Sequence, residues 1–154
     1  MKYKLALTIF ILISSIISHS LSQENEIKII SNELKIDTDK NISTFIGDVN
    51  ATNQNLKMWS DKMIITLKED NDNVKEILAI GNVKIIRIFE GTEIYGEVAN
   101  YSIENEIITI DKNVIIIEDG NEVRGSQLIV DLKNSSSIMT ASDSNRVEAI
   151  ILNN

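Results

Sequence analysis

The sequence predicts an all-β protein, and three observations support this fold class. Short apolar runs alternate with turn-like clusters such as DTDKN, ATNQN and EDGNE, which is the pattern of strands joined by turns. Ile is over-used, and β-branched residues favour strands. No segment after residue 22 keeps a helical apolar period. The pattern is typical of a sandwich, barrel or solenoid, and 154 residues favour one domain.

Residues 1–22 have the order of a secretory signal peptide. Two lysines precede an apolar run over 5–17, and Ser20 and Ser22 then occupy the −3 and −1 positions of a cleavage site. The run is shorter than the roughly 20 apolar residues that span a bilayer. We therefore predict export, cleavage and a single mature domain at 23–154. The alternative is an uncleaved N-terminal anchor.

The mature chain is predicted to consist of successive short strands. In chain order the apolar runs occupy 27–30, 63–67, 74–80, 83–88, 107–110, 114–117, 128–132 and 147–152. Asp119-Gly120 predicts a tight hairpin, because Gly tolerates positive φ. Residues 139–145 read as a looser loop before the last strand. Aromatic residues make up only 5 % of the chain, so we expect an aliphatic core.

One signature recurs four times: apolar, any, Ser or Gly, two variable positions, apolar, any, apolar. Its copies lie at 29–36, 58–65, 94–101 and 123–130, and the small residues are 29, 36 and 29 positions apart. The first apolar residue shares a face with the small residue, but the next apolar residue comes three positions later. A regular strand cannot do this without a bulge or corner. We predict that each strand turns between two sheets at its Ser or Gly.

A second signature interleaves with the first, at 45–49, 79–83 and 110–114. The copies recur after 34 and then 31 residues, and Lys112 replaces Gly in the third. A period near 30 that holds several strands is typical of repeat architectures, in which neighbouring units stack to bury their apolar faces.

The alternation along these signatures assigns one apolar set to the inside of the fold. Its members are Leu34, Ile36, Phe45, Val49, Met63, Ile65, Val83, Ile85, Tyr101, Val114, Ile116, Leu128 and Val130. Polar neighbours such as Lys62, Lys84 and Asn100 are expected to point outward. Both ends of the mature chain have strand character without a cap. Such edges either pair head to tail with another copy or are covered by their own loops.

The residues of common active sites are missing. The one His is His19, inside the predicted signal peptide, and the chain has no Cys. The mature chain therefore lacks the residues that usually form Ser-His and Cys-His catalytic sites and zinc sites. Carboxylates are plentiful, so the residue types present would allow a two-carboxylate glycosidase. The candidate carboxylates are expected at turns or on the outside without a motif, namely Asp48, Asp61, Glu97, Asp111 and Asp131. We predict a non-enzyme with no metal and no cofactor.

The net charge of the chain limits the classes of molecule that it can bind. The formal net charge is −8, and an acidic surface repels phosphate backbones, so we expect no nucleic-acid partner. It would also repel an anionic membrane surface. A lipid partner would therefore be held chiefly by its acyl chains.

Six segments in order, SNELKID, FIGDVNAT, LKMWSDKMIITL, VKEILAIGNVKI, IYGEVANYSIENEIITI and EVRGSQLIVDL, resemble the LptA/OstA-like family of periplasmic lipopolysaccharide-transport proteins. The resemblance covers about residues 28–152. Two departures are Lys112 in place of Gly and Ser60 in place of the usual Ala before Asp61.

The resemblance implies a twisted β-jellyroll of many short antiparallel strands, open at both ends, with an apolar groove. The inward apolar set would line that groove and shield the acyl chains of lipid A. The protein would pass lipopolysaccharide from the inner to the outer membrane. Its partners would be an LptC-like inner-membrane protein, an LptD-like outer-membrane protein and further copies of itself, head to tail.

Two alternatives stay open at this point. An LptC-like protein would share the domain but keep its N-terminal anchor. A structural or adhesive β-repeat protein would instead fill the same inward positions with a closed core and bind no lipid.

Overall fold

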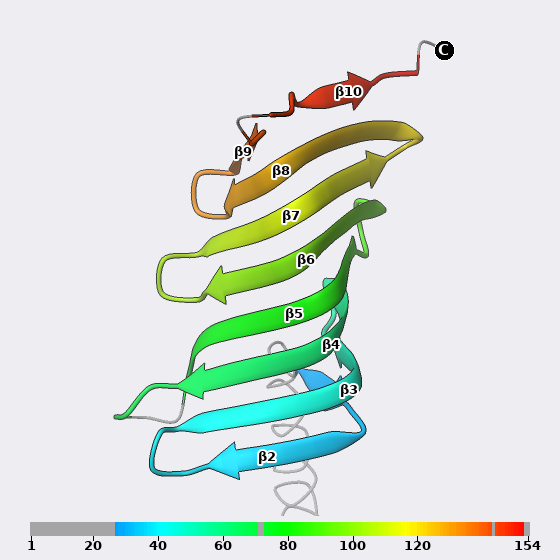
Figure 1. Ribbon diagram of the computed structural model, residues 1–154. Helices are drawn as coiled ribbons and strands as arrows, with labels where there is room; N and C mark the ends of the chain where they lie inside the picture. Colours follow the sequence, from blue (N-terminus) through cyan, green and yellow to red (C-terminus); the bar gives the residue numbers. More distant parts are fainter. Residues whose placement is uncertain (1–26, 71–72, 143, 153–154) are drawn as a thin grey trace, which may run out of the picture.

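The computed structural model describes residues 27–70, 73–142 and 144–152, which form one antiparallel sheet of ten strands (Figure 1). The strands are β1 (Lys28–Ile30), β2 (Glu33–Asp37), β3 (Ile42–Thr52), β4 (Leu56–Leu67), β5 (Val74–Arg87), β6 (Thr92–Ser102), β7 (Ile107–Glu118), β8 (Asn121–Asp131), β9 (Ser136–Thr140) and β10 (Glu148–Ile150). No helix occurs in these three segments, so the all-β prediction is confirmed. The predicted signal peptide lies outside the described residues.

The sheet is an up-and-down meander with a divided strand at each edge. Strands β3 to β8 lie side by side in chain order. At one edge β1 and β2 both pair with β3, and at the other edge β9 and β10 both pair with β8. The two edges do not pair with each other in the described residues. The sheet is therefore open, as predicted.

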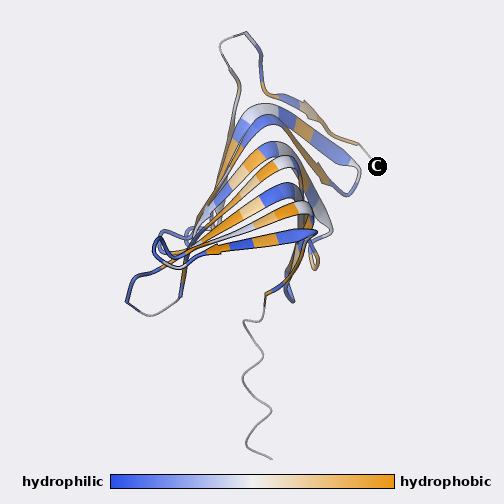
Figure 2. Cartoon of the chain, turned by 60° about the horizontal axis from the view of Figure 1, so that its bottom comes forward, coloured by the Kyte–Doolittle hydropathy of each residue, from blue (hydrophilic) through white to orange (hydrophobic). Residues whose placement is uncertain are grey.

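The long strands are bent, and the sheet has two arms that meet at a corner (Figure 2). The pairing register shifts near the middle of every pair from β3–β4 to β7–β8. We call the half that contains β2 and β9 the first arm, and the half that contains β1 and β10 the second arm. The predicted runs at 74–80 and 83–88 are thus the two halves of β5. The expected turn between two sheets is a corner within one continuous sheet.

The second signature supplies the backbone of the corner. Gly47 and Gly81 both have φ of 81°, and the residue after each also has positive φ. Two consecutive left-handed residues form a bulge that redirects the strand. Lys112, at φ 65°, adopts the same region without glycine's freedom, so the third copy keeps the corner despite the departure in sequence. A side chain in this region costs roughly 1–2 kcal/mol.

The first signature supplies the space at the corner. Ser60, Gly96 and Gly125 pair directly with the three valines of the second signature, Val49, Val83 and Val114. A Cβ on Gly96 would lie 2.5 Å from Cγ2 of Ile110. The small residue is needed because a branched neighbour and the next strand already fill the inside of the bend.

Side-chain hydrogen bonds tie the strands together on the outside of the corner. Asn32 donates to Asp48 at 3.2 Å, Asn82 donates to Asp61 at 2.8 Å, and Asn113 donates to Glu97 at 2.6 Å. Three of the carboxylates considered for an enzyme pair therefore accept structural hydrogen bonds from a neighbouring strand or connection.

The core lies in the inner angle between the arms. Its fully buried side chains are Val49, Met63, Ile85, Val83, Ile110, Val114 and Leu128. The buried hydrophobic residues include no aromatic side chain in the described segments, which agrees with the expected aliphatic core. Lys62, Lys84 and Asn100 alternate with these buried positions along their strands and lie on the outer face.

Candidate functional site

An open cavity of about 510 Å³ lies between the inner faces of the two arms. Its volume falls in the range of roughly 300–1,000 Å³ that is usual for ligand pockets. The apolar side chains around it come from β1 and from β3 to β8, together with the adjoining turns. They are Ile27, Ile29, Ala51, Leu56, Met58, Met63, Ile77, Ile85, Phe89, Ile94, Ile108, Ile110, Val130 and Leu132.

The cavity lining follows from the cross-strand register. In the first arm Ile77 pairs with Tyr101 and Ile108 pairs with Val130. These pairs belong to one row, since paired residues of neighbouring strands share a face. In the second arm the corresponding row passes through Met58, Ile85 and Ile94. The two rows face each other across the angle of the sheet, and the cavity occupies the space between them.

The residues that the sequence assigned to the inside fall into three groups. Met63, Ile85, Tyr101 and Val130 line the cavity. Seven further members belong to the hydrophobic core or pack against it, buried or half-buried: Phe45, Val49, Ile65, Val83, Val114, Ile116 and Leu128. Leu34 and Ile36 lie on the edge strand β2 and are 49 % and 66 % exposed.

Several lining residues were not singled out from the sequence. They are chiefly Ile29, Met58, Ile77, Ile94, Ile108 and Ile110. A signal for three of them was present, because Ile29, Met58 and Ile94 each occupy the first apolar position of the first signature. The corner bulge brings that position to the same face as the later apolar positions, so the apolar positions of the signature share one face.

The polar part of the lining lies at the ends of the second-arm strands. Arg87, the last residue of β5, forms an ion pair with Glu90 in the β5–β6 turn, with Nη2 2.6 Å from Oε1. Asn53 organises the neighbouring β3–β4 turn by accepting hydrogen bonds from the backbone N–H groups of Asn55 and Leu56, at 2.9 and 2.8 Å. These residues also line the cavity.

The lining is almost uncharged. Among the described residues that surround the cavity, Arg87 and Glu90 are the only charged side chains. Burial raises the pKa of the Tyr101 hydroxyl, and the charge of Glu106 adds to this effect, so Tyr101 is neutral at ordinary pH. The arrangement suits an elongated apolar ligand whose polar end lies near the open side.

The part of the chain that the structure describes contains no group of three or more His, Cys, Asp or Glu side chains placed to hold a metal ion. Within the same segments no helix is long and apolar enough to cross a membrane.

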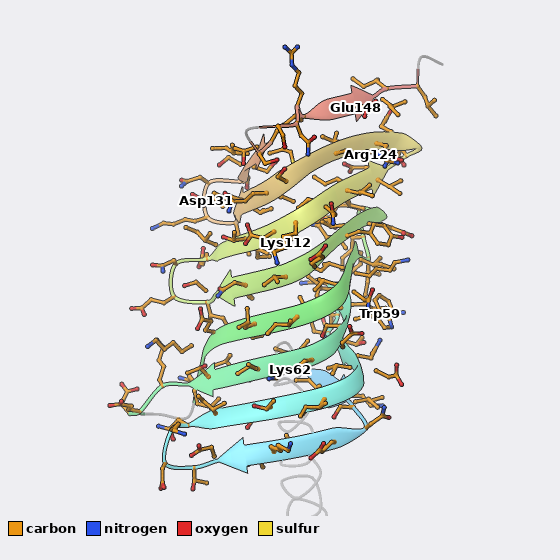
Figure 3. The ribbon with its side chains drawn as sticks, in the orientation of Figure 1. Trp59, Lys62, Lys112, Arg124, Asp131 and Glu148 are labelled. Atoms are coloured by element: carbon orange, nitrogen blue, oxygen red, sulfur yellow. The ribbon has the colours of Figure 1, made fainter. Side chains whose placement is uncertain are left out.

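Figure 3 shows Trp59, Lys62 and Lys112 along the sheet. Trp59 lies on the outer face of β4, between Asn50 and Lys84 on the neighbouring strands.

Comparison with known proteins identifies the family to which the chain belongs. A search of curated protein sequences found no match. Among solved structures, the fold is similar to that of LptH from Pseudomonas aeruginosa, the LptA-homologous periplasmic component of the conserved lipopolysaccharide transport device. The TM-score is 0.74 at 14 % sequence identity, and the match covers 85 % of this chain and 98 % of that one.

The family model of the LptA/(LptD N-terminal domain) LPS transport protein matches residues 28–136. This segment runs from β1 to the start of β9 and holds every corner pair described above. The sequence signatures, the open bent sheet and the family model agree, and the chain belongs to the LptA/LptD N-terminal domain family of lipopolysaccharide-transport proteins.

Proposed function

We propose that this protein is a periplasmic carrier that shields the acyl chains of lipid A in its groove and passes lipopolysaccharide toward the outer membrane. The observation that carries the proposal is the open apolar cavity between the arms. Burial of each lipid CH₂ contributes about 0.8 kcal/mol, so a few acyl chains would bind firmly. The acidic surface would not prevent this, because the attraction is apolar.

The open edges support assembly with other proteins of the same fold. Ile36 at one edge and Ile138 at the other are 66 % and 62 % exposed. Edge strands with free backbone groups and exposed apolar side chains pair readily with a further strand. We propose head-to-tail contact between copies, with an LptC-like protein at one end of the bridge and an LptD-like protein at the other. The role is that of a carrier and not of an enzyme.

Site-specific photo-crosslinking in cells tests the proposal. Strand β6 offers a matched pair of tyrosines: Tyr101 lines the cavity, whereas Tyr95 lies on the outer face beside Lys84. A benzoylphenylalanine probe replaces each in turn. Lipopolysaccharide adducts at 101 and none at 95 would support the groove. A folded, exported protein without adducts at either position would favour a structural β-repeat protein.

The N-terminus distinguishes the carrier from an LptC-like membrane-anchored component. Mass spectrometry of the protein isolated from its native envelope would find a start at Gln23 if the signal peptide is cleaved. A retained residue 1 would favour the anchored alternative.

A further inference from the structure

The open side of the groove carries one opposite-charge pair. The side chains of Arg87 and Glu90 are 47 % and 42 % exposed, and both line the cavity. Phe89, between them in the chain, is 78 % exposed and lines it too. The turn thus presents a cation, an anion and a large apolar side chain to whatever enters the groove.

The turn does not need the ion pair to keep its shape. The N–H of Gly91 donates to the carbonyl of Arg87 at 2.9 Å, and the N–H of Ile88 donates to the carbonyl of Asn55 at 2.9 Å. Gly91, at φ 68°, supplies the positive φ that the turn requires. A half-exposed ion pair contributes only about 0–1 kcal/mol. The Arg87 guanidinium is therefore free to exchange its partner without unfolding the turn.

A buried hydroxyl lies close to the same position. Thr92 pairs across the strands with Arg87, is only 4 % exposed, and its Oγ1 has no hydrogen-bond partner among the described residues. Buried hydroxyls are usually hydrogen-bonded. Thr92 does not line the cavity, so its hydroxyl adds a buried polar group beside Arg87 and is not itself a contact for a ligand.

The chemistry of the ligand completes the argument. A guanidinium binds phosphate with two parallel hydrogen bonds, and such charge-assisted contacts are stronger than neutral ones. The chain carries a formal net charge of −8, so an anionic headgroup meets repulsion over most of the surface. Within the described lining, Arg87 is the one cation that can offset this repulsion.

We propose that Arg87 is the headgroup-recognition residue of the groove, and that it exchanges Glu90 for a phosphate of the bound amphiphile. This inference rests on the proposed function, because the acyl chains in the cavity bring the phosphate to the open side. Glu90 competes with the ligand for the guanidinium and keeps binding weak enough for transfer. The groove then discriminates phosphorylated lipids from unphosphorylated ones with the same chains.

The test measures the affinity of purified protein for phosphorylated lipid A and for the same lipid after enzymatic dephosphorylation. Arg87→Gln should weaken binding of the phosphorylated lipid about tenfold and leave the dephosphorylated lipid unchanged. Glu90→Gln should tighten binding of the phosphorylated lipid about threefold, because it removes the competitor. A loss of folding cannot produce that gain.

A second Arg–Glu pair provides the control. Arg124 and Glu122 lie two residues apart on β8 and form an ion pair away from the cavity lining, and Figure 3 shows Arg124 near β10. Arg124→Gln makes the same change in net charge and should alter neither affinity. An equal effect of Arg87→Gln and Arg124→Gln would reduce the role of Arg87 to general charge and overturn the inference.

The outcomes separate the inference from the proposed function. If wild-type protein binds both lipids and Arg87→Gln changes neither affinity, Arg87 has no recognition role and the carrier function stands. If wild-type protein binds neither lipid, the carrier function itself fails. A last experiment adds inorganic phosphate as a competitor. Displacement of the lipid by millimolar phosphate would mean that Arg87 belongs to a site for free anions, and would overturn the assignment to a lipid headgroup.

Discussion

Replacement of Gly96 by Ala is the most direct test of the corner. Gly96 pairs with Val83 on β5, and the new Cβ would lie 2.5 Å from Cγ2 of Ile110 and 3.4 Å from the carbonyl oxygen of Asp111. Real Cβ contacts are not this short, and the Cγ2 of Ile110 is attached to a branched Cβ and is not the free end of a flexible side chain. Gly96→Ala should therefore force the strands β6 and β7 apart at the bend.

The size of the effect follows from two opposing contributions. Overpacking of a filled core costs about 1–3 kcal/mol. Alanine also restricts the unfolded chain more than glycine does, which stabilises the folded state by about 0.4–1 kcal/mol where alanine can adopt the native backbone conformation. Gly96 meets that condition, because it is not among the residues with positive φ. A net loss of about 1–2 kcal/mol in the free energy of unfolding should result, with a fall in Tm of roughly 3–8 °C.

The assay is urea unfolding, followed by the fluorescence of Trp59, the single tryptophan, and by circular dichroism. The rescue variant is Ile110→Leu, because leucine lacks the Cγ2 branch that the new Cβ meets. In the double variant Gly96→Ala/Ile110→Leu, most of the loss in unfolding free energy caused by Gly96→Ala should disappear. A double-mutant cycle measures this coupling between the two positions. Wild-type stability of Gly96→Ala, or additive effects of the two changes, would refute the steric account of the signature.

Three further predictions concern stability. Ser60→Ala and Thr92→Val each remove a buried hydroxyl without a hydrogen-bond partner in the described structure, so each should be neutral or stabilising by up to about 1 kcal/mol; a clear loss in urea unfolding would reveal a partner for that hydroxyl. Lys112→Gly restores glycine at φ 65° and should stabilise by about 1 kcal/mol, whereas a loss would mean that the lysine side chain itself contributes. Asn134 donates side-chain and backbone hydrogen bonds that lower the pKa of Asp131 below its usual 3.8; the carboxylate therefore contributes stability above about pH 3.8 that disappears as the pH falls through the lower folded-state pKa. The difference in unfolding free energy between wild type and Asp131→Asn should shrink with acidification, and a difference independent of pH would contradict this.

The corner shows how much of the fold was readable in the sequence. The two signatures are the two sides of one contact, Val on one strand and Ser or Gly on the next. Their spacing along the chain indicated repetition and a break in alternation. It predicted a strand that turns at the break, but it did not reveal that both arms belong to one continuous sheet, because alternation along a strand does not say which strands pair with it.

The groove was harder to predict than the fold. Alternation assigns a side chain to a face but not to a depth within the angle of the sheet. Val83 and Tyr101 both point inward, yet Val83 lies in the filled corner and Tyr101 lines the cavity further out. That difference depends on the distance of each residue from the bend and on the angle between the arms, which arises from all the bulges together. The pairing of Arg87 with Glu90 was missed for a related reason, since charged residues beside a turn are usually ordinary surface residues.

The paired corner also makes the protein modular. Each Val-to-Ser/Gly contact joins two neighbouring strands, and the next equivalent contact begins two strands later. Insertion or loss of one such hairpin would leave the remaining contacts, the angle of the sheet and the width of the groove unchanged. Only the length of the channel would differ. A protein built on this corner can therefore lengthen or shorten its sheet by whole hairpins, without redesign of the side chains that line the groove.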